Sequence, residues 1–159
     1  MRITLRSKAA DETRAIGEAI ATLLRPGDTL ILTGELGAGK TTFVQGVAAG
    51  LGIDDPVTSP TFVLVHEHEG RLPLTHADVY RLRRVQDVLD LELVDEDRVL
   101  LVEWGDAIRD LLPTDHLRVE LTAPTDDEER RIVLEADATA WSERWSALSA
   151  GIGAWEGSP

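Results

Sequence analysis

The residues best suited to chemistry form a glycine-rich loop that ends in a lysine and a threonine. Gly34-Glu-Leu-Gly-Ala-Gly-Lys-Thr41 matches the pattern G-x-x-x-x-G-K-[ST] without deviation. Glycines allow the backbone to fold tightly, so that successive N–H groups point at phosphate oxygens. The lysine neutralises phosphate charge, and the threonine hydroxyl is a hard oxygen ligand for Mg²⁺. The loop therefore predicts that the chain binds a nucleoside triphosphate together with magnesium.

The phosphate contacts can be assigned residue by residue along this loop. Lys40 would neutralise the β and γ phosphates, and the Thr41 hydroxyl would be a magnesium ligand. The helix that follows would direct its positive N-terminal end at the same anion. The residues expected to surround the nucleotide are Gly34, Leu36, Gly37, Ala38, Gly39, Lys40, Thr41 and Thr42.

The sequence also indicates which nucleotide is bound. A GTPase needs an Asn-Lys-x-Asp-type element to recognise guanine, but this chain has no asparagine, and Lys8 is its only other lysine. It also lacks an Asp-x-x-Gly switch and the Leu-Ser-Gly-Gly signature of ABC-type ATPases. ATP is therefore the expected nucleotide, although a P-loop alone does not define a function.

Two acidic residues are candidates for the remaining chemistry, with Lys40 as the third catalytic group. Glu103 closes the apolar run Val99–Val102, where P-loop enzymes place an acid that holds magnesium, usually through water. Asp78 follows an expected strand and could orient the attacking water or accept its proton. Thr58–Thr61 could approach the γ-phosphate as a switch loop does. Taken singly, each is also compatible with an ordinary strand end or turn.

Residue periodicity predicts the elements that must position these groups. Strands are expected at Thr29–Thr33, Phe62–His68, Leu72–Ala77, Arg98–Glu103, Leu117–Thr122 and Arg131–Ala136, the last two as an antiparallel hairpin. Helices are expected at Ala9–Leu24, with Ser7 as its cap, and at Lys40–Leu51, Val85–Leu93, Ala107–Leu112 and Thr139–Leu148. Residues 1–150 should form one domain, and residues 151–159 a loose tail in which Trp155 could dock.

Charge and composition restrict the class of protein. The chain has no cysteine, which excludes disulfides, thiolate metal sites and cysteine catalysis. It has neither a membrane-length apolar run nor an apolar signal region, so we expect a cytoplasmic protein. The net charge of −13 would repel a phosphate backbone, so direct binding of nucleic acid is not expected. Local basic clusters are interpreted as solvated faces: Arg81, Arg83 and Arg84, and Arg130 and Arg131.

Four segments together resemble one protein family, and in the same order. They are Gly34–Phe43, Thr58–Val65, His76–Leu82 and Leu101–Asp106, and they look like the bacterial TsaE family, also called YjeE. The combination of Ser-Pro-Thr-Phe, Asp-x-Tyr-Arg and Val-Glu-Trp is far more specific than the P-loop. The similarity covers residues 5–135 and excludes the C-terminal tail.

The resemblance implies an α/β fold, a P-loop NTPase-like three-layer sandwich with a mainly parallel central sheet and added antiparallel strands. It implies a Mg²⁺-dependent ATPase, weak alone, that acts with TsaB and TsaD to form threonylcarbamoyladenosine (t6A) at position 37 of tRNAs reading ANN codons. Those partners would hold the tRNA. By this resemblance Thr41 and Glu103 hold magnesium, Asp78 serves hydrolysis, Trp104 packs beside the site or at the partner surface, and adenine lies near residues 8–11. The loop before Arg130 lacks a glycine often seen there, which leaves open whether Arg130 or Arg131 reaches the nucleotide.

Two other functions remain compatible with the sequence. A small-molecule kinase could use Arg81, Arg83 and Arg84 as a lid over the phosphates, and it would consume ATP only with a small acceptor. A nucleotide-gated binding module would bind ATP and hydrolyse almost none. An ATPase of the kind implied above would instead respond to protein partners.

Overall fold

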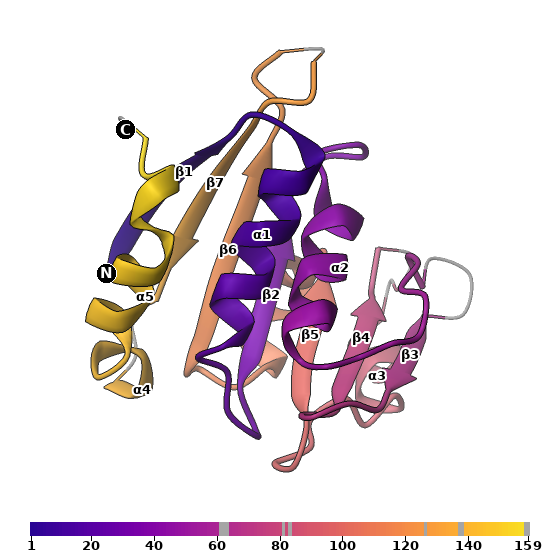
Figure 1. Ribbon diagram of the computed structural model, residues 1–159. Helices are drawn as coiled ribbons and strands as arrows, with labels where there is room; N and C mark the ends of the chain where they lie inside the picture. Colours follow the sequence, from indigo (N-terminus) through magenta and orange to yellow (C-terminus); the bar gives the residue numbers. More distant parts are fainter. Residues whose placement is uncertain (61–63, 81, 83, 126, 137–138, 158–159) are drawn as a thin grey trace.

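The computed structural model describes residues 1–159 except 61–63, 81, 83, 126, 137–138 and 158–159. Among the described residues, seven strands form one twisted sheet at the centre of the molecule (Figure 1). Their spatial order is β1-β7-β6-β2-β5-β4-β3. The strands are β1 (Arg2–Ser7), β2 (Thr29–Thr33), β3 (Val65–His68), β4 (Leu74–Asp78), β5 (Val99–Glu103), β6 (His116–Thr122) and β7 (Arg130–Glu135).

The middle of the sheet is parallel and its margins are antiparallel. β2 pairs in parallel with β5 and β6, and β4 pairs in parallel with β5. β7 runs antiparallel to β6 and β1, and β3 runs antiparallel to β4. The predicted fold class is confirmed. The arrangement brings the carboxyl ends of β2, β4 and β5 to one edge, where ligands of open α/β sheets usually bind.

Helices cover the two faces of the sheet unequally. α1 (Ala10–Ala21), α2 (Lys40–Gly50) and α5 (Trp145–Ile152) lie on the front face in Figure 1. α3 (Val85–Leu89) lies behind β4 and β5 in the same view, and the 3-10 helix η1 (Gly105–Leu111) packs with it on that rear side. Successive strand residues alternate between these layers, so Leu101 joins the core under α1 and α2, whereas Val102 joins the rear core.

The backbones of helices α1 and α2 approach each other closely at glycine positions. A Cβ atom on Gly46 would lie 2.0 Å from the carbonyl oxygen of Arg14, and one on Gly17 would lie 2.5 Å from that of Phe43. Only glycine fits at such an approach. This contact fixes the position of α2, the helix that begins at Lys40.

The first helix is shorter than predicted and is capped differently. α1 ends at Ala21 rather than Leu24, and its N-cap residue is Ala9, which makes no side-chain cap. Ser7 is therefore not the cap. Its buried hydroxyl bonds to the carbonyl of Ala9 and the hydroxyl of Thr13. By contrast, β2 and the β6–β7 hairpin are confirmed, and α2 ends one residue early.

The C-terminal region also departs from the prediction. The single helix expected at Thr139–Leu148 is divided into α4 (Thr139–Ser142) and α5, and Arg144 between them turns its side chain into the protein. Residues 151–157 are not loose. They complete α5, form the 3-10 helix η2 (Gly153–Trp155) and add a bridge from Glu156 to Leu5 on β1. Trp155 packs against the core.

No helix in the described part of the chain combines the length and the apolar character needed to cross a membrane.

Candidate functional site

A cavity of about 540 Å³ opens at the carboxyl ends of the parallel strands. This volume lies within the usual range of small-molecule sites, roughly 300–1,000 Å³. Its walls come from the P-loop, the start of α2, the ends of β4 and β5, and the start of β7. The lining residues are Leu36, Gly37, Gly39, Lys40, Thr41, Thr42, Ser59, Asp78, Tyr80, Glu103, Trp104 and Arg130.

The P-loop has the backbone conformation that its glycines permit. Gly34, Gly37 and Gly39 all have positive φ, at 147°, 81° and 99°. A Cβ at Gly34 would lie 2.5 Å from the carbonyl oxygen of Leu121, so the loop can cross β6 only with glycine there. Gly39 precedes α2 without a side-chain cap, which leaves the helix's first N–H groups to an anion.

Six of the eight predicted nucleotide-binding residues line the cavity: Leu36, Gly37, Gly39, Lys40, Thr41 and Thr42. Gly34 and Ala38 do not line it; they line a second hollow of about 570 Å³, to which Leu36 and Gly37 also contribute. Leu36 is 96% exposed at the tip of the loop.

Lys40 is buried and makes its contacts within the loop. Its Nζ donates to the carbonyl oxygens of Gly34 at 2.7 Å and Glu35 at 2.9 Å, and it lies 4.5 Å from the centroid of the Trp104 indole. Burial lowers the pKa of the Lys40 ammonium, while the carboxylates of Glu103 and Asp78 act in the opposite direction. Phosphate oxygens would replace the two carbonyl acceptors when a nucleotide binds.

The two predicted acids lie side by side at the floor of the cavity. Asp78 and Glu103 are register partners on β4 and β5, and both are nearly fully buried. Asp78 is the last residue of its strand rather than a residue beyond it, which corrects the predicted end at Ala77. Its Oδ1 accepts a hydrogen bond from the N–H of Tyr80 at 3.0 Å. The structure therefore brings Lys40, Asp78 and Glu103 together at one cavity, and their catalytic roles stay predictions.

A histidine that the sequence analysis did not select lies next to Glu103. His76 is fully buried on β4, and its Nε2 is 3.4 Å from Glu103 Oε1. Its place two residues before Asp78 in a strand puts it on the same side of the sheet as that acid, and this alternation could have identified it.

Two aromatic residues form one wall of the cavity. The rings of Tyr80 and Trp104 have centroids 4.8 Å apart, and Tyr80 is 61% exposed. Trp104 has φ of 61°, in the left-handed region, where the chain leaves β5 and enters η1. The expectation that Trp104 packs beside the site is met by this contact and by its contact with Lys40.

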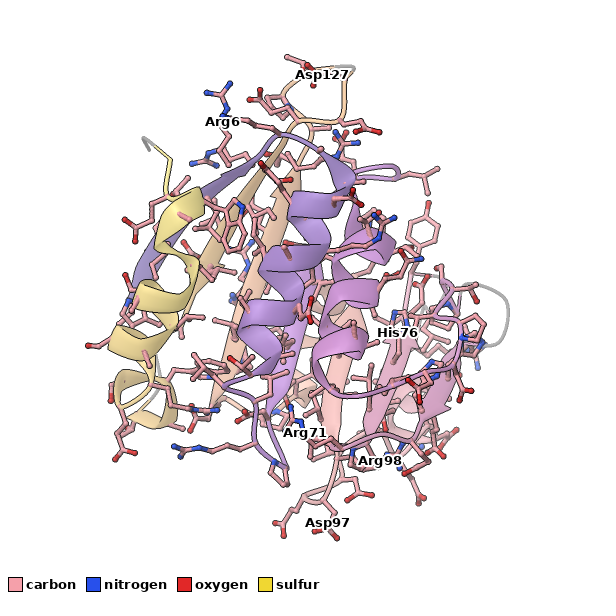
Figure 2. All side chains as sticks on the ribbon, in the orientation of Figure 1. Arg6, Arg71, His76, Asp97, Arg98 and Asp127 are labelled. Atoms are coloured by element: carbon pink, nitrogen blue, oxygen red, sulfur yellow. The ribbon has the colours of Figure 1, made fainter. Side chains whose placement is uncertain are left out.

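Arg130 reaches the P-loop from the opposite end of the sequence. Its Nη2 donates to the carbonyl oxygen of Gly37 at 3.3 Å, and its Nη1 donates to the carbonyls of Asp127 and Glu129. Arg131 is not among the cavity-lining residues. Figure 2 shows Asp127 in the loop that joins β6 to β7, at the same edge of the sheet as the P-loop.

The remaining predicted groups are placed as follows. Ser59 lines the cavity, whereas Thr58 does not, and Thr61 lies outside the described residues. Arg81, Arg83 and Phe62, the predicted start of a strand, also lie outside the described residues. Residues 8–11 do not line the cavity, and the adenine position stays a prediction.

The donor set fits a magnesium ion held partly by phosphates. Within the described residues, no group of three or more histidine, cysteine or acidic side chains could hold a metal by itself. Mg²⁺ typically takes only one or two protein oxygens and completes its shell with phosphate and water. Thr41 and Glu103 both line the cavity, and Glu103 Oε1 is a buried acceptor without a hydrogen bond from any described residue.

The chain is similar to known proteins over most of its length. The family model described as threonylcarbamoyl adenosine biosynthesis protein TsaE matches residues 7–132. The tRNA threonylcarbamoyladenosine biosynthesis protein TsaE of Bacillus subtilis is 43% identical over 140 residues, covering 87% of this chain and 85% of that protein. The protein of the same name from Streptomyces coelicolor is 40% identical over 148 residues, covering 87% and 97%.

A solved structure shares the fold. The crystal structure titled Bacillus subtilus YdiB superposes with a TM-score of 0.79 at 36% sequence identity, covering 94% of this chain and 95% of that one. The match to the family model, the two relatives and this structure agree with one another. The chain belongs to the TsaE family.

Proposed function

We propose that this protein is a Mg²⁺-dependent ATPase subunit required for t6A formation at position 37 of tRNAs that read ANN codons, acting with TsaB and TsaD. Family membership supports the role in t6A biosynthesis. The observation that carries the ATPase assignment is the convergence of Lys40, Thr41, Asp78 and Glu103 on one cavity. The residues come from three different elements and are the set that phosphoryl transfer to water needs.

Each residue has a defined task in this proposal. The P-loop N–H groups and Lys40 bind the phosphates and neutralise their charge. Thr41 and Glu103 would hold magnesium, which would neutralise phosphate charge when bound. Asp78 orients the attacking water and accepts its proton, so that ATP and water give ADP and phosphate. Arg130 steadies the loop through the carbonyl of Gly37.

The arrangement of Lys40 favours an enzyme that is weak by itself. Its ammonium is bonded to two carbonyls of its own loop and lies against Trp104, so binding ATP must first replace these contacts. Tyr80 and Leu36 are exposed at the cavity, where a partner protein could cover them and exclude water. We attribute partner dependence to these features.

The chain's net charge of −13 supports an indirect relation to tRNA. Such a charge opposes approach to a polyanion, so the partner subunits would bind the tRNA. We propose a cytoplasmic location as part of the same function.

One experiment combines nucleotide binding with the cellular product. The host's copy of the gene is depleted, and wild-type or Lys40→Ala protein is supplied in its place. Nucleosides from total tRNA are then quantified, and ATP binding is measured on the purified proteins. We expect Lys40→Ala to lose tight ATP binding and to leave t6A low, while the wild type restores it.

Normal t6A in depleted cells that hold no second copy of the gene would overturn the pathway assignment. A small-molecule kinase would be indicated instead if ATP consumption required a small-molecule acceptor and did not change when TsaB and TsaD were added. Tight ATP binding with negligible hydrolysis, with or without these partners, would indicate a nucleotide-gated binding module.

A further inference from the structure

His76 is a buried polar side chain that the chemistry above leaves unused. It has no exposed surface, and neither ring nitrogen has a hydrogen-bond partner among the described residues. Glu103 Oε1 is buried and unpartnered in the same sense. Burying such groups without partners is unfavourable, and an apolar side chain of similar size would avoid the penalty. The position therefore calls for an explanation beyond packing.

The sheet register explains why these two groups meet. Asp78 is opposite Glu103 on the parallel strands β4 and β5, and His76 precedes Asp78 by two residues. The three side chains therefore lie on the α2 side of the sheet. His76 is farther from the carboxyl ends of the strands than the two acids are. Figure 2 shows His76 on β4, within the interior of the molecule. Its Nε2 is 3.4 Å from Glu103 Oε1.

We propose that His76 is a positioning residue for Glu103, holding one carboxylate oxygen so that the other is directed to magnesium. The inference rests on the proposed function, because it assigns Glu103 to the metal. The imidazole N–H at Nε2 would donate to Oε1, and a small adjustment would shorten the present 3.4 Å to a hydrogen bond. Both side chains are almost fully buried, so bulk solvent does not reach this side of Glu103 in the folded protein.

A competing partner for Glu103 explains why such a hold is needed. Lys40 is the cation that Glu103 acts on electrostatically, and both line the cavity. A carboxylate without His76 would be drawn toward Lys40, which would remove an oxygen from magnesium. Side chains that orient a metal ligand typically change metal affinity by about 10- to 100-fold when replaced.

The test measures magnesium affinity without hydrolysis. Purified protein is saturated with a non-hydrolysable ATP analogue, and Mg²⁺ is titrated while tryptophan fluorescence is recorded, since Trp104 lines the cavity. We expect His76→Phe to raise the Mg²⁺ concentration at half-saturation by about tenfold or more. Binding of the analogue in EDTA should stay within about twofold of wild type, because the P-loop is intact.

Two further variants give the test its specificity. His76→Gln keeps a donor and should recover part of the magnesium affinity. His68→Phe is the matched control: His68 is also buried and its Nε2 has no hydrogen-bond partner among the described residues, but it lies on β3 and does not line the cavity. It should leave the magnesium midpoint unchanged. If His76→Phe does not fold, as shown by the absence of cooperative thermal unfolding, His76→Leu, which also lacks a donor, carries the comparison.

Failure of this inference can be separated from failure of the proposed function. Glu103→Gln should raise the magnesium midpoint, and adding His76→Phe to it should cause little further change if the two act as one unit. A wild-type midpoint in a folded variant that lacks a donor at position 76, with Glu103→Gln impaired, would overturn the positioning role alone. A wild-type midpoint in Glu103→Gln would overturn the metal assignment that both proposals share.

Discussion

Gly46 offers a sharp test of how the nucleotide-binding helix is held. Replacing it with alanine places a Cβ 2.0 Å from the carbonyl oxygen of Arg14 on α1. This oxygen belongs to the backbone of a helix, so it cannot move aside as a side chain could. For the contact to reach even 3.0 Å, α1 and α2 must separate locally by at least about 1 Å. Since α2 begins at Lys40, the separation would also disturb the phosphate site.

The magnitude follows from two opposing effects. Overpacking of a closed interior typically costs about 1–3 kcal/mol, and a clash with backbone belongs at the upper end. Alanine recovers about 1 kcal/mol because it favours the helix over glycine. The net loss in the free energy of unfolding should be about 2 kcal/mol. For a chain of this length that corresponds to a fall in Tm of about 4–8 °C.

Urea denaturation followed by far-UV circular dichroism measures the effect, with Gly151→Ala as the matched control. Gly151 lies in α5, and an added Cβ there would meet nothing within 4 Å. That variant should be stabilised, by up to about 1 kcal/mol. Equal behaviour of the two variants, or a gain in stability for Gly46→Ala, would refute the close packing of α1 on α2.

Three further predictions address the site and its surroundings. Arg130→Ala should weaken ATP binding about tenfold, the value of one charge-assisted hydrogen bond, when measured by calorimetry. Arg144→Ala should lower the free energy of unfolding, measured in urea, by about 3 kcal/mol. The change removes the cation of a buried ion pair and leaves the carboxylate of Asp28 buried and unpaired. Burial, and secondarily the charges of neighbouring histidines, lower the pKa of His68 below its ordinary 6.5. As pH falls, this histidine therefore becomes protonated at a higher pH in the unfolded chain than in the folded one. Below pH 6.5 the free energy of unfolding should fall more in the wild type than in His68→Gln.

Each of these has an outcome that contradicts it. Arg131→Ala should leave the ATP affinity within about twofold of wild type. Equal losses of affinity in the two arginine variants would contradict a specific contribution of Arg130 at the P-loop. A loss below about 1 kcal/mol for Arg144→Ala would indicate that its ion pair behaves as an exposed one. Identical pH profiles of urea stability for the wild type and His68→Gln would show that His68 is not the group that titrates.

The parts of the site that the sequence predicted correctly are those set by local patterns. Thr29–Thr33 is uniformly buried, and its β-rich composition predicted a short strand with the observed bounds. The glycines of the P-loop and the start of α2 follow from a short motif with a direct backbone requirement. Glu103 was identified because it ends a second strand of the same kind.

The parts that were missed depend on contacts between distant residues. His76 meets Glu103 only because β4 and β5 pair in parallel with one particular register. The sequence left open whether Arg130 reaches the site, because its hydrogen bond to Gly37 spans 93 positions and no local pattern encodes it. The division of the last helix at Arg144 follows from an ion pair with Asp28, 116 positions away. Propensity favoured one continuous helix, and this tertiary contact overrode it.

We expect the cavity to bind Mg-ATP and its two acids, Asp78 and Glu103, to be needed for hydrolysis rather than for binding. The most direct test is single-turnover hydrolysis of γ-labelled ATP in the presence of TsaB and TsaD, by wild type, Asp78→Asn and Glu103→Gln. Binding of a non-hydrolysable analogue is titrated in parallel. We predict analogue affinities within a few-fold of wild type and hydrolysis slowed at least about 100-fold in each variant. Wild-type hydrolysis rates in both variants would contradict the account.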